Sequence, residues 1–163
     1  MIRGPRGSRG LVRAAILATV IALSGLMLAN PAPAQATHAR SDRERLIGAW
    51  HLVALNQAGP GDVANLEGTL IYTRDGHMSV QIMYPNAQSD LSNDYVLHGY
   101  EASFGSYDVN EAAHTITHHV RGSITRGLVG KNLTRVYQFT ADGHLVIRSA
   151  LPTEHWSVEW QHD

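Results

Sequence analysis

The sequence predicts an all-β fold in which eight short antiparallel strands form a meander. Three observations support this prediction: eight short runs of β-forming residues, tight turns that contain glycine, and no long helical pattern after the first forty residues. Eight such strands can close into a barrel whose interior is filled or holds one small ligand. A flattened sandwich is the alternative.

The N-terminal segment has the layout of a secretory signal peptide. Four arginines in the first thirteen residues precede an apolar run from Ala14 to Ala29, and the small-residue site Ala34-Gln35-Ala36 follows. The run is shorter than the roughly 20 residues that span a bilayer, which disfavours an uncleaved anchor. We therefore expect residues 1–36 to be a signal peptide, residues 37–163 to be the folded domain, and the mature protein to be exported, periplasmic or extracellular, with no membrane span.

Residues 37–163 have the composition of one globular domain without disulfides. They carry nine basic and fourteen acidic side chains and no cysteine. Nucleic acid is not an expected partner, because an acidic chain without a basic face cannot gain counterion release from a phosphate backbone. The absence of cysteine excludes disulfides, a thiolate nucleophile and a Cys-based metal site. The oligomeric state is left open.

The elements follow one another along the chain at short, regular intervals. Residues 41–46 have a short helical pattern. Asp75-Gly76 is a two-residue turn typical of hairpins, and Ala141-Asp142-Gly143 is a second turn. Residues 122–132, which contain three glycines and one arginine, are expected to form a loop, and residues 85–97 are polar and irregular. The eight predicted strands span residues 47–56, 68–74, 77–84, 100–109, 114–121, 133–140, 144–150 and 155–161.

Several phrases of the sequence resemble the small bacterial and fungal lipocalin-like domain family. Gly48-Ala49-Trp50 is similar to the Gly-x-Trp signature at the start of lipocalin barrels. Further similar phrases are Leu46-Ile47, Leu70-Ile71-Tyr72-Thr73 with Asp75 to Gln81, Phe104-Gly105-Ser106-Tyr107, and Thr117-His118-His119-Val120 with Gly122-Ser123. Their order and spacing carry the resemblance from Leu46 to Trp160.

The resemblance implies an eight-stranded antiparallel up-and-down barrel with an internal cup. It implies that Trp50 closes one end of the barrel, with an arginine, Arg135, packed over its ring. It does not settle activity, because the wider barrel group includes both ligand carriers and isomerases or cyclases. Ser103 stands where an aromatic residue is usual in the family, and residues 85–97 are shortened, which would leave the mouth of the barrel more open.

Strand alternation predicts which side chains face the interior. On each strand we take the more apolar alternate set as inward, which places His118 inside and His119 outside. The predicted inward set comprises Trp50, Leu52, Ala54, Val80, Ile82, Ile116, His118, Val120, Leu133, Arg135, Tyr137, Phe139, Trp156, Val158 and Trp160. Tyr72 and Phe104 join this set if their strands are in phase, but a bulge at Gly105 would reverse the phase there.

The candidate ligand-binding residues are the polar and aromatic members of this interior. They are Tyr72, Phe104, His118, Arg135 and Tyr137. His118 is either a hydrogen-bonded core histidine or a ligand contact that can transfer a proton. Arg135 either packs over Trp50 or pairs with a ligand carboxylate. Trp156 and Trp160, spaced by two with Val158, are expected to be core residues.

Ten histidines raise the question of a metal, but their spacing does not favour one. His114 and His118 on one strand would lie about 13 Å apart, and His118 and His119 face opposite sides. No hydrolase elbow, phosphate-binding glycine loop or paired catalytic carboxylates occur as motifs. We therefore expect no metal and no cofactor.

These observations predict an exported lipocalin-like protein that binds a small apolar or amphipathic molecule in the barrel cup. The alternative is a cofactor-free isomerase or cyclase that uses the same cavity, with His118 as acid or base. A filled barrel with a scaffold role and no ligand is a third possibility.

Overall fold

The computed structural model describes residues 40–56, 65–85 and 90–163. The predicted signal peptide and its cleavage site lie outside the described residues. The described chain contains one short helix, α1 (Asp42–Leu46), and one 3-10 turn, η2 (Arg126–Leu128). The strands are β1 (Gly48–Asn56), β2 (Glu67–Tyr72), β3 (His77–Met83), β4 (Tyr100–Asn110), β5 (Thr115–Ser123), β6 (Asn132–Phe139), β7 (Leu145–Ser149) and β8 (Ser157–His162).

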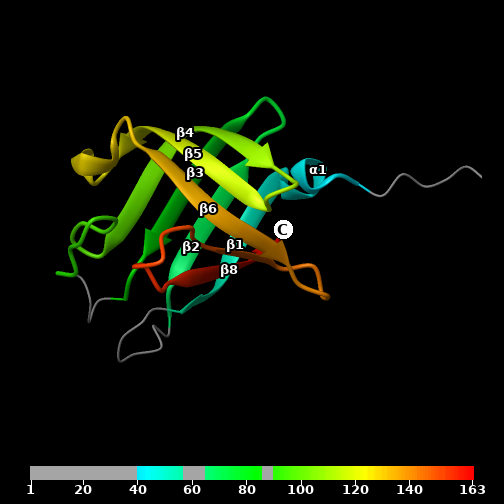
Figure 1. Cartoon of the computed structure of the whole chain (residues 1–163). Coiled ribbons are helices and arrows are strands. Elements are labelled where there is room, and N and C mark those ends of the chain that lie inside the picture. The colour runs from blue at the N-terminus through cyan, green and yellow to red at the C-terminus, as the bar shows by residue number, and fades with distance from the viewer. Residues whose placement is uncertain (1–39, 57–64, 86–89) are drawn as a thin grey trace, which may run out of the picture. The chain divides into compact units, whose positions relative to one another are not determined.

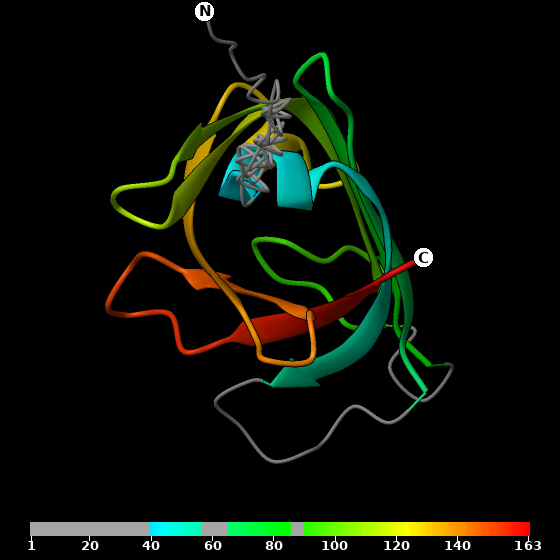
Figure 2. The same ribbon diagram turned by 90° about the vertical axis from the view of Figure 1, so that its right-hand side faces the viewer.

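The eight strands form a closed antiparallel barrel. Each strand pairs with the next along the chain, and β1 pairs with β8 to close the ring. Figure 1 shows the barrel from the side, and Figure 2 shows the ring of strands from the side on which α1 lies. The predicted all-β, up-and-down barrel is confirmed, and the observed strands start and end within two residues of the predicted ones.

The turns at Asp75-Gly76 and Asp142-Gly143 are longer than two residues. Gly76 donates its N–H to the Thr73 carbonyl at 3.1 Å, and the strands are joined by a bond from Thr73 N–H to the His77 carbonyl at 2.9 Å. Gly76 has a φ of 88°, so the chain makes a type I turn followed by a left-handed glycine. The expectation of a two-residue turn at Asp75-Gly76 is therefore corrected. The turn expected at Ala141-Asp142-Gly143 has the same hydrogen bonds, between Thr140, Gly143 and His144.

The helix α1 closes one end of the barrel. Ser41 and Glu44 form a reciprocal capping box, which lets five residues form a helix. The helix places Leu46 in the core, where its carbonyl accepts a 2.9 Å hydrogen bond from the Trp50 indole N–H. Trp50 is thereby held at the closed end, as the resemblance implied.

The Gly-x-Trp phrase has a local reason in the structure. Gly48 has a φ of 143°, and the imidazole of His162 occupies the space that a side chain at this position would need. The same His162 ring packs edge-on against Trp50, with ring centroids 4.6 Å apart. A glycine before the tryptophan therefore lets the last strand cover the indole.

A bulge in β1 changes the predicted inward set. Leu52 pairs with Trp160, and Ala54, not Val53, pairs with Glu159. The extra residue shifts the alternation, so Leu55 is buried and faces the interior. The prediction that Ala54 lines the interior is therefore wrong, whereas the inward positions of Trp50, Val80, Ile82, Val158 and Trp160 are confirmed by their burial.

A second bulge lies between β4 and β5, close to the predicted position. Phe104 pairs with Gly122, but Gly105 pairs with Val120, so Arg121 is the extra residue. Phe104 is 59% exposed and lies outside the barrel, which corrects its expected place in the lumen. Its ring covers Gly122, where a side chain would collide with it.

No helix among the described residues is long and apolar enough to cross a membrane.

Candidate functional site

The barrel encloses a cavity of about 410 Å³ near the end opposite α1. The loops at this end contribute Asn93, Tyr95, Val96, Leu128, Thr153, His155 and Trp156 to its wall. The strands contribute mainly apolar side chains: Leu55, Leu70, Val80, Ile82, Leu133, Ile147, Val158 and Trp160. This volume and lining are those of a pocket for one small organic molecule.

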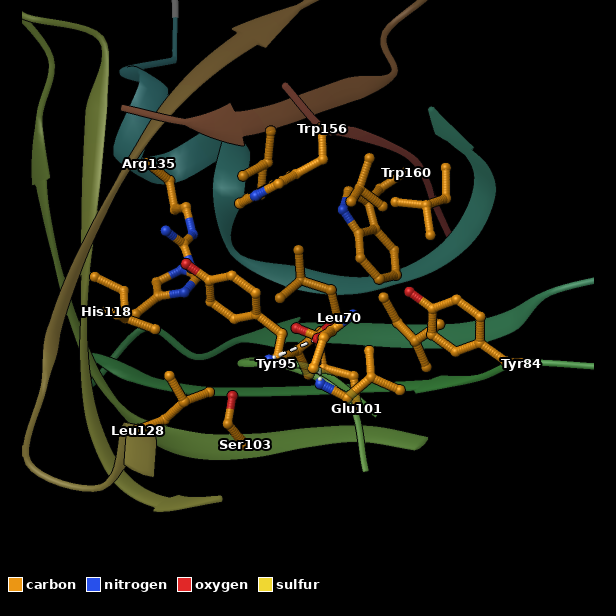
Figure 3. Close-up of a pocket in the computed structure, with 18 of the residues that line it drawn as sticks. Leu70, Tyr84, Tyr95, Glu101, Ser103, His118, Leu128, Arg135, Trp156 and Trp160 are labelled. Atoms are coloured by element: carbon orange, nitrogen blue, oxygen red, sulfur yellow. Dashed lines mark hydrogen bonds between the residues drawn. The ribbon is translucent and has the colours of Figure 1, made fainter. Parts of the chain in front are cut away.

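Besides His155 in the loop before β8, the cavity wall contains three acidic or basic side chains on successive strands. They are Glu101 on β4, His118 on β5 and Arg135 on β6. Figure 3 shows Arg135 and His118 at one side of the cavity, with Trp160 and Tyr84 at the other. The guanidinium and the imidazole therefore make one side of the cavity polar, whereas Glu101 lies away from them, toward Leu70 and Tyr84.

Arg135 is buried, with 6% of its surface exposed, and lies against two aromatic rings of the loops. Its guanidinium carbon is 4.8 Å from the centroid of Trp156 and 5.2 Å from that of Tyr95. These distances are those of cation–π contacts. The expected packing of Arg135 over Trp50 is therefore wrong.

The reason for this difference is the position of Arg135 along its strand. Among the residues of β6, Phe139, four positions further along, packs on Trp50, with centroids 6.3 Å apart. Four residues of a strand span about 13 Å, so Arg135 lies well away from the closed end. The arginine at that end is Arg45 of α1, whose guanidinium carbon is 3.7 Å from the Phe139 ring centroid.

Glu154 holds both rings that contact Arg135. Its carboxylate accepts a hydrogen bond from the Tyr95 hydroxyl at 2.9 Å and from the Trp156 indole N–H at 3.0 Å. Burial alone would raise the pKa of Glu154, but these hydrogen bonds, one from Ser149 and the charge of Arg135 lower it overall. Glu154 is therefore ionised and fixes the two rings around the guanidinium.

His118 is hydrogen-bonded inside the barrel. Its Nε2 lies 2.7 Å from the hydroxyl of Tyr72 on β2. Burial, and next the charge of Arg135, lower the pKa of His118 to about 3, while burial raises the pKa of Tyr72. Both side chains are therefore neutral near pH 7.

Glu101 is a site residue that the sequence reasoning missed. Burial raises its pKa to about 7, although the nearby Arg135 charge acts in the opposite direction. Alternation along β4 could have found it, because Glu101, Ser103 and Tyr107 share the inward face. A carboxyl with this pKa changes its charge within the physiological range.

The five predicted ligand-binding residues occupy three different places. His118 and Arg135 line the cavity, and Tyr72 lies beside it through its bond to His118. Tyr137 belongs to the closed end, where its hydroxyl donates to Asp42 at 3.0 Å and its ring packs on Phe139. Phe104 is outside, so only part of the predicted set comes together.

The two tryptophans expected to be core residues both face the cavity. Trp160 is buried on β8, whereas Trp156 precedes that strand and is half-buried in the loop.

In the part of the chain that the structure describes, no three His, Asp or Glu side chains are grouped so that they could hold a metal ion.

The comparison with known families agrees with the observed architecture. The model of the lipocalin-like domain family matches residues 47–161, which include all eight strands except for the last residue of β8. No curated protein matches the chain closely enough to count as similar. The match covers more than half of the chain and coincides with the closed barrel, and the chain therefore belongs to the lipocalin-like domain family.

Proposed function

We propose that this protein binds one small apolar or amphipathic molecule inside the barrel. The observation that carries the proposal is the cavity of about 410 Å³ with its mainly apolar wall. A scaffold with a filled barrel would not keep such a space, because protein interiors are normally packed to high density. The family is consistent with this function, since a closed eight-stranded barrel can hold one small ligand.

The geometry favours binding over catalysis by His118. A general acid or base works best when its pKa lies near the working pH, whereas His118 has a pKa of about 3 and shares its Nε2 with Tyr72. The alternative of a cofactor-free isomerase or cyclase would instead depend on Glu101, the cavity group that titrates near pH 7. Conversion of a bound molecule into a product would therefore support the enzyme alternative, and it is to be measured alongside binding.

We also propose that the protein acts after export, outside the cytoplasm. The support is the sequence pattern of an arginine-bearing start, an apolar run and the site Ala34-Gln35-Ala36. A carrier in this location would take up its ligand from the envelope or the medium.

Native mass spectrometry of protein purified from its own host tests the binding proposal. We expect a mass increment from a small organic molecule, which is lost when Ser103 in the cavity wall is replaced by Phe. The matched control is Ala102→Phe, one residue earlier on β4 and on the outer face. An increment that Ser103→Phe leaves unchanged would place the molecule elsewhere and refute the cavity as the site.

A further inference from the structure

We propose that Arg135 is the anion-binding group of the cavity and that the ligand is an amphipathic carboxylate whose head group pairs with this guanidinium. This inference rests on the proposed function and specifies the chemical class of the ligand. It assigns the polar side of the cavity to the carboxylate and the apolar side to a hydrocarbon tail.

The first argument is that Arg135 forms no direct ion pair among the described residues, although ionised Glu154 lies close enough for its pKa to be lowered by the Arg135 charge. An arginine side chain stays protonated in proteins, and this one is almost fully buried. Among the described residues, no carboxylate lies within ion-pairing distance of its guanidinium, whereas the guanidinium of Arg45 pairs with Asp42 at 3.2 Å. A buried charge is costly unless it is paired, so a ligand anion would supply the missing partner.

The second argument is the way in which the guanidinium is held. Trp156 and Tyr95 lie against it at cation–π distances, and Glu154 fixes the orientation of both rings. The two rings pack edge to face, with centroids 6.1 Å apart. One N–H group of the guanidinium is hydrogen-bonded to the Tyr95 hydroxyl. A guanidinium has five N–H donors, so others remain that can bind a carboxylate.

The third argument is the charge of the other groups near Arg135. His118 is neutral, and Glu154 is ionised but is not part of the cavity wall, since its carboxylate accepts hydrogen bonds from the two rings. Glu101 is the remaining carboxyl of the wall, and it lies on β4, two strands away from Arg135 on β6. Protonated Glu101 adds no negative charge to the wall, whose basic groups are Arg135, His118 and His155. The guanidinium of Arg135 then favours an anion over a neutral or cationic molecule.

The apolar side of the cavity fits the rest of such a molecule. Trp160 and Leu70 lie away from Arg135 in Figure 3, and aliphatic side chains from β1, β3, β7 and β8 also line the cavity. A carboxylate bound at Arg135 would place its hydrocarbon tail among them. The geometry thus indicates a monocarboxylate with an aliphatic tail.

A matched series of eight-carbon ligands tests the inference. Octanoate, 1-octanol and octylamine have the same tail and differ in the charge of the head group, and their affinities are measured by titration calorimetry at pH 7. We expect octanoate to bind about 10- to 100-fold more tightly than 1-octanol, the range for a charge-assisted hydrogen bond. We expect octylamine to bind most weakly.

Arg135→Gln should remove this preference and lower the affinity for octanoate to that for 1-octanol. The control is Arg148→Gln, which removes an exposed arginine on the neighbouring strand β7 and should leave the preference unchanged. If Arg135→Gln does not fold, the ligand series on the natural protein still decides, together with Arg135→Lys, which keeps the charge and should retain part of the preference.

The outcomes separate this inference from the proposed function. Equal affinity for octanoate and 1-octanol would overturn the role of Arg135 while supporting an apolar binding cavity. Binding of the uncharged fluorescent probe N-phenyl-1-naphthylamine without binding of any octyl ligand would also overturn it. Failure of every probe, together with native mass spectra free of ligand, would instead refute the proposed function itself.

Discussion

The hydroxyl of Tyr72 and the Nε2 atom of His118 lie 2.7 Å apart in the interior, joining β2 to β5. The two rings also contact each other, with centroids 5.7 Å apart, and Tyr72 packs on Tyr107 at 4.7 Å. A neutral imidazole satisfies the hydrogen-bonding capacity of the Tyr72 hydroxyl. A protonated imidazole would place a second positive charge near Arg135. The pair therefore links the protonation state of His118 to the stability of the barrel.

Replacement of His118 by Gln should reduce the loss of stability in acid. The pKa of His118 is about 3 in the folded protein and about 6.5 in an unfolded chain. Between about pH 6.5 and pH 3, the unfolded state therefore binds a proton that the folded state does not bind. The free energy of unfolding falls as the pH decreases through this range. His118→Gln removes this titration. The decrease in the free energy of unfolding between pH 7 and pH 4, measured by urea unfolding, should therefore be about 2 to 3 kcal/mol smaller in the variant.

His119→Gln is the control for this prediction, because His119 lies on the outer face. Hydrogen bonds to Asn132 and Asp108, both 2.8 Å long, raise the pKa of His119, so its contribution to stability has the opposite pH dependence. We also expect His118→Gln to weaken ligand binding more than His119→Gln does. Equal acid sensitivity of the natural protein and His118→Gln would show that His118 is not held neutral by its surroundings.

Replacement of Glu101 by Gln should stabilise the protein at alkaline pH. Burial raises the pKa of Glu101 to about 7 from an ordinary value of 4.5, so the folded state holds a proton that the unfolded state releases. Stability from this group is present below about pH 4.5 and is lost as the pH rises through 7. Glu101→Gln should therefore gain about 1 to 3 kcal/mol at pH 8 relative to pH 4.5, as measured by urea unfolding at both values.

The same titration should affect ligand binding if Arg135 holds a carboxylate. Ionised Glu101 would compete with the ligand for the charge of Arg135, so octanoate should bind more tightly at pH 6 than at pH 8. Glu101→Gln should abolish this difference, and binding that tightens with rising pH would contradict it. The exposed carboxylate Glu67 on β2 offers a matched control, Glu67→Gln.

The fold could be predicted from the sequence because it depends on local patterns. Two-residue alternation and the Gly-containing turns at Gly76 and Gly143 determine where strands begin and end, and these signals lie within a few residues of one another. The bulge at Val53 could not be predicted, since nothing in the local sequence distinguishes it. That single extra residue moved Leu55 into the cavity in place of Ala54.

The candidate site was predicted less well because it is assembled from distant segments. Tyr95, Glu154 and Trp156 come from two loops about sixty residues apart in the sequence, and no spacing rule joins them to Arg135. The barrel interior is also divided along its length. Alternation identifies inward side chains such as Tyr137, but it cannot tell those that line the cavity from those that fill the closed end.

We expect the exported protein to begin at Thr37. Ala34-Gln35-Ala36 directly follows the apolar run and has the small residues that signal peptidase requires on either side of the central position. N-terminal sequencing of the protein recovered from the periplasm or the medium tests this. Ala36→Leu should slow processing, and recovery of an intact Met1 in the exported fraction would contradict the prediction.

Removal of the Trp50 indole should destabilise the barrel by about 3 to 5 kcal/mol, the range for deleting a large buried aromatic side chain. Trp50 is 2% exposed, donates to the Leu46 carbonyl and packs against Phe139 and His162. Trp50→Ala would leave a cavity at the closed end and detach α1 from the first strand. Trp50→Phe keeps a ring but loses the hydrogen bond, so it should lower the free energy of unfolding by less than Trp50→Ala does. The control, Val53→Ala on the outer face, should change the free energy of unfolding by less than about 1 kcal/mol. A loss for Trp50→Ala no larger than that of Val53→Ala, measured by urea unfolding, would mean that the closed end does not depend on this residue.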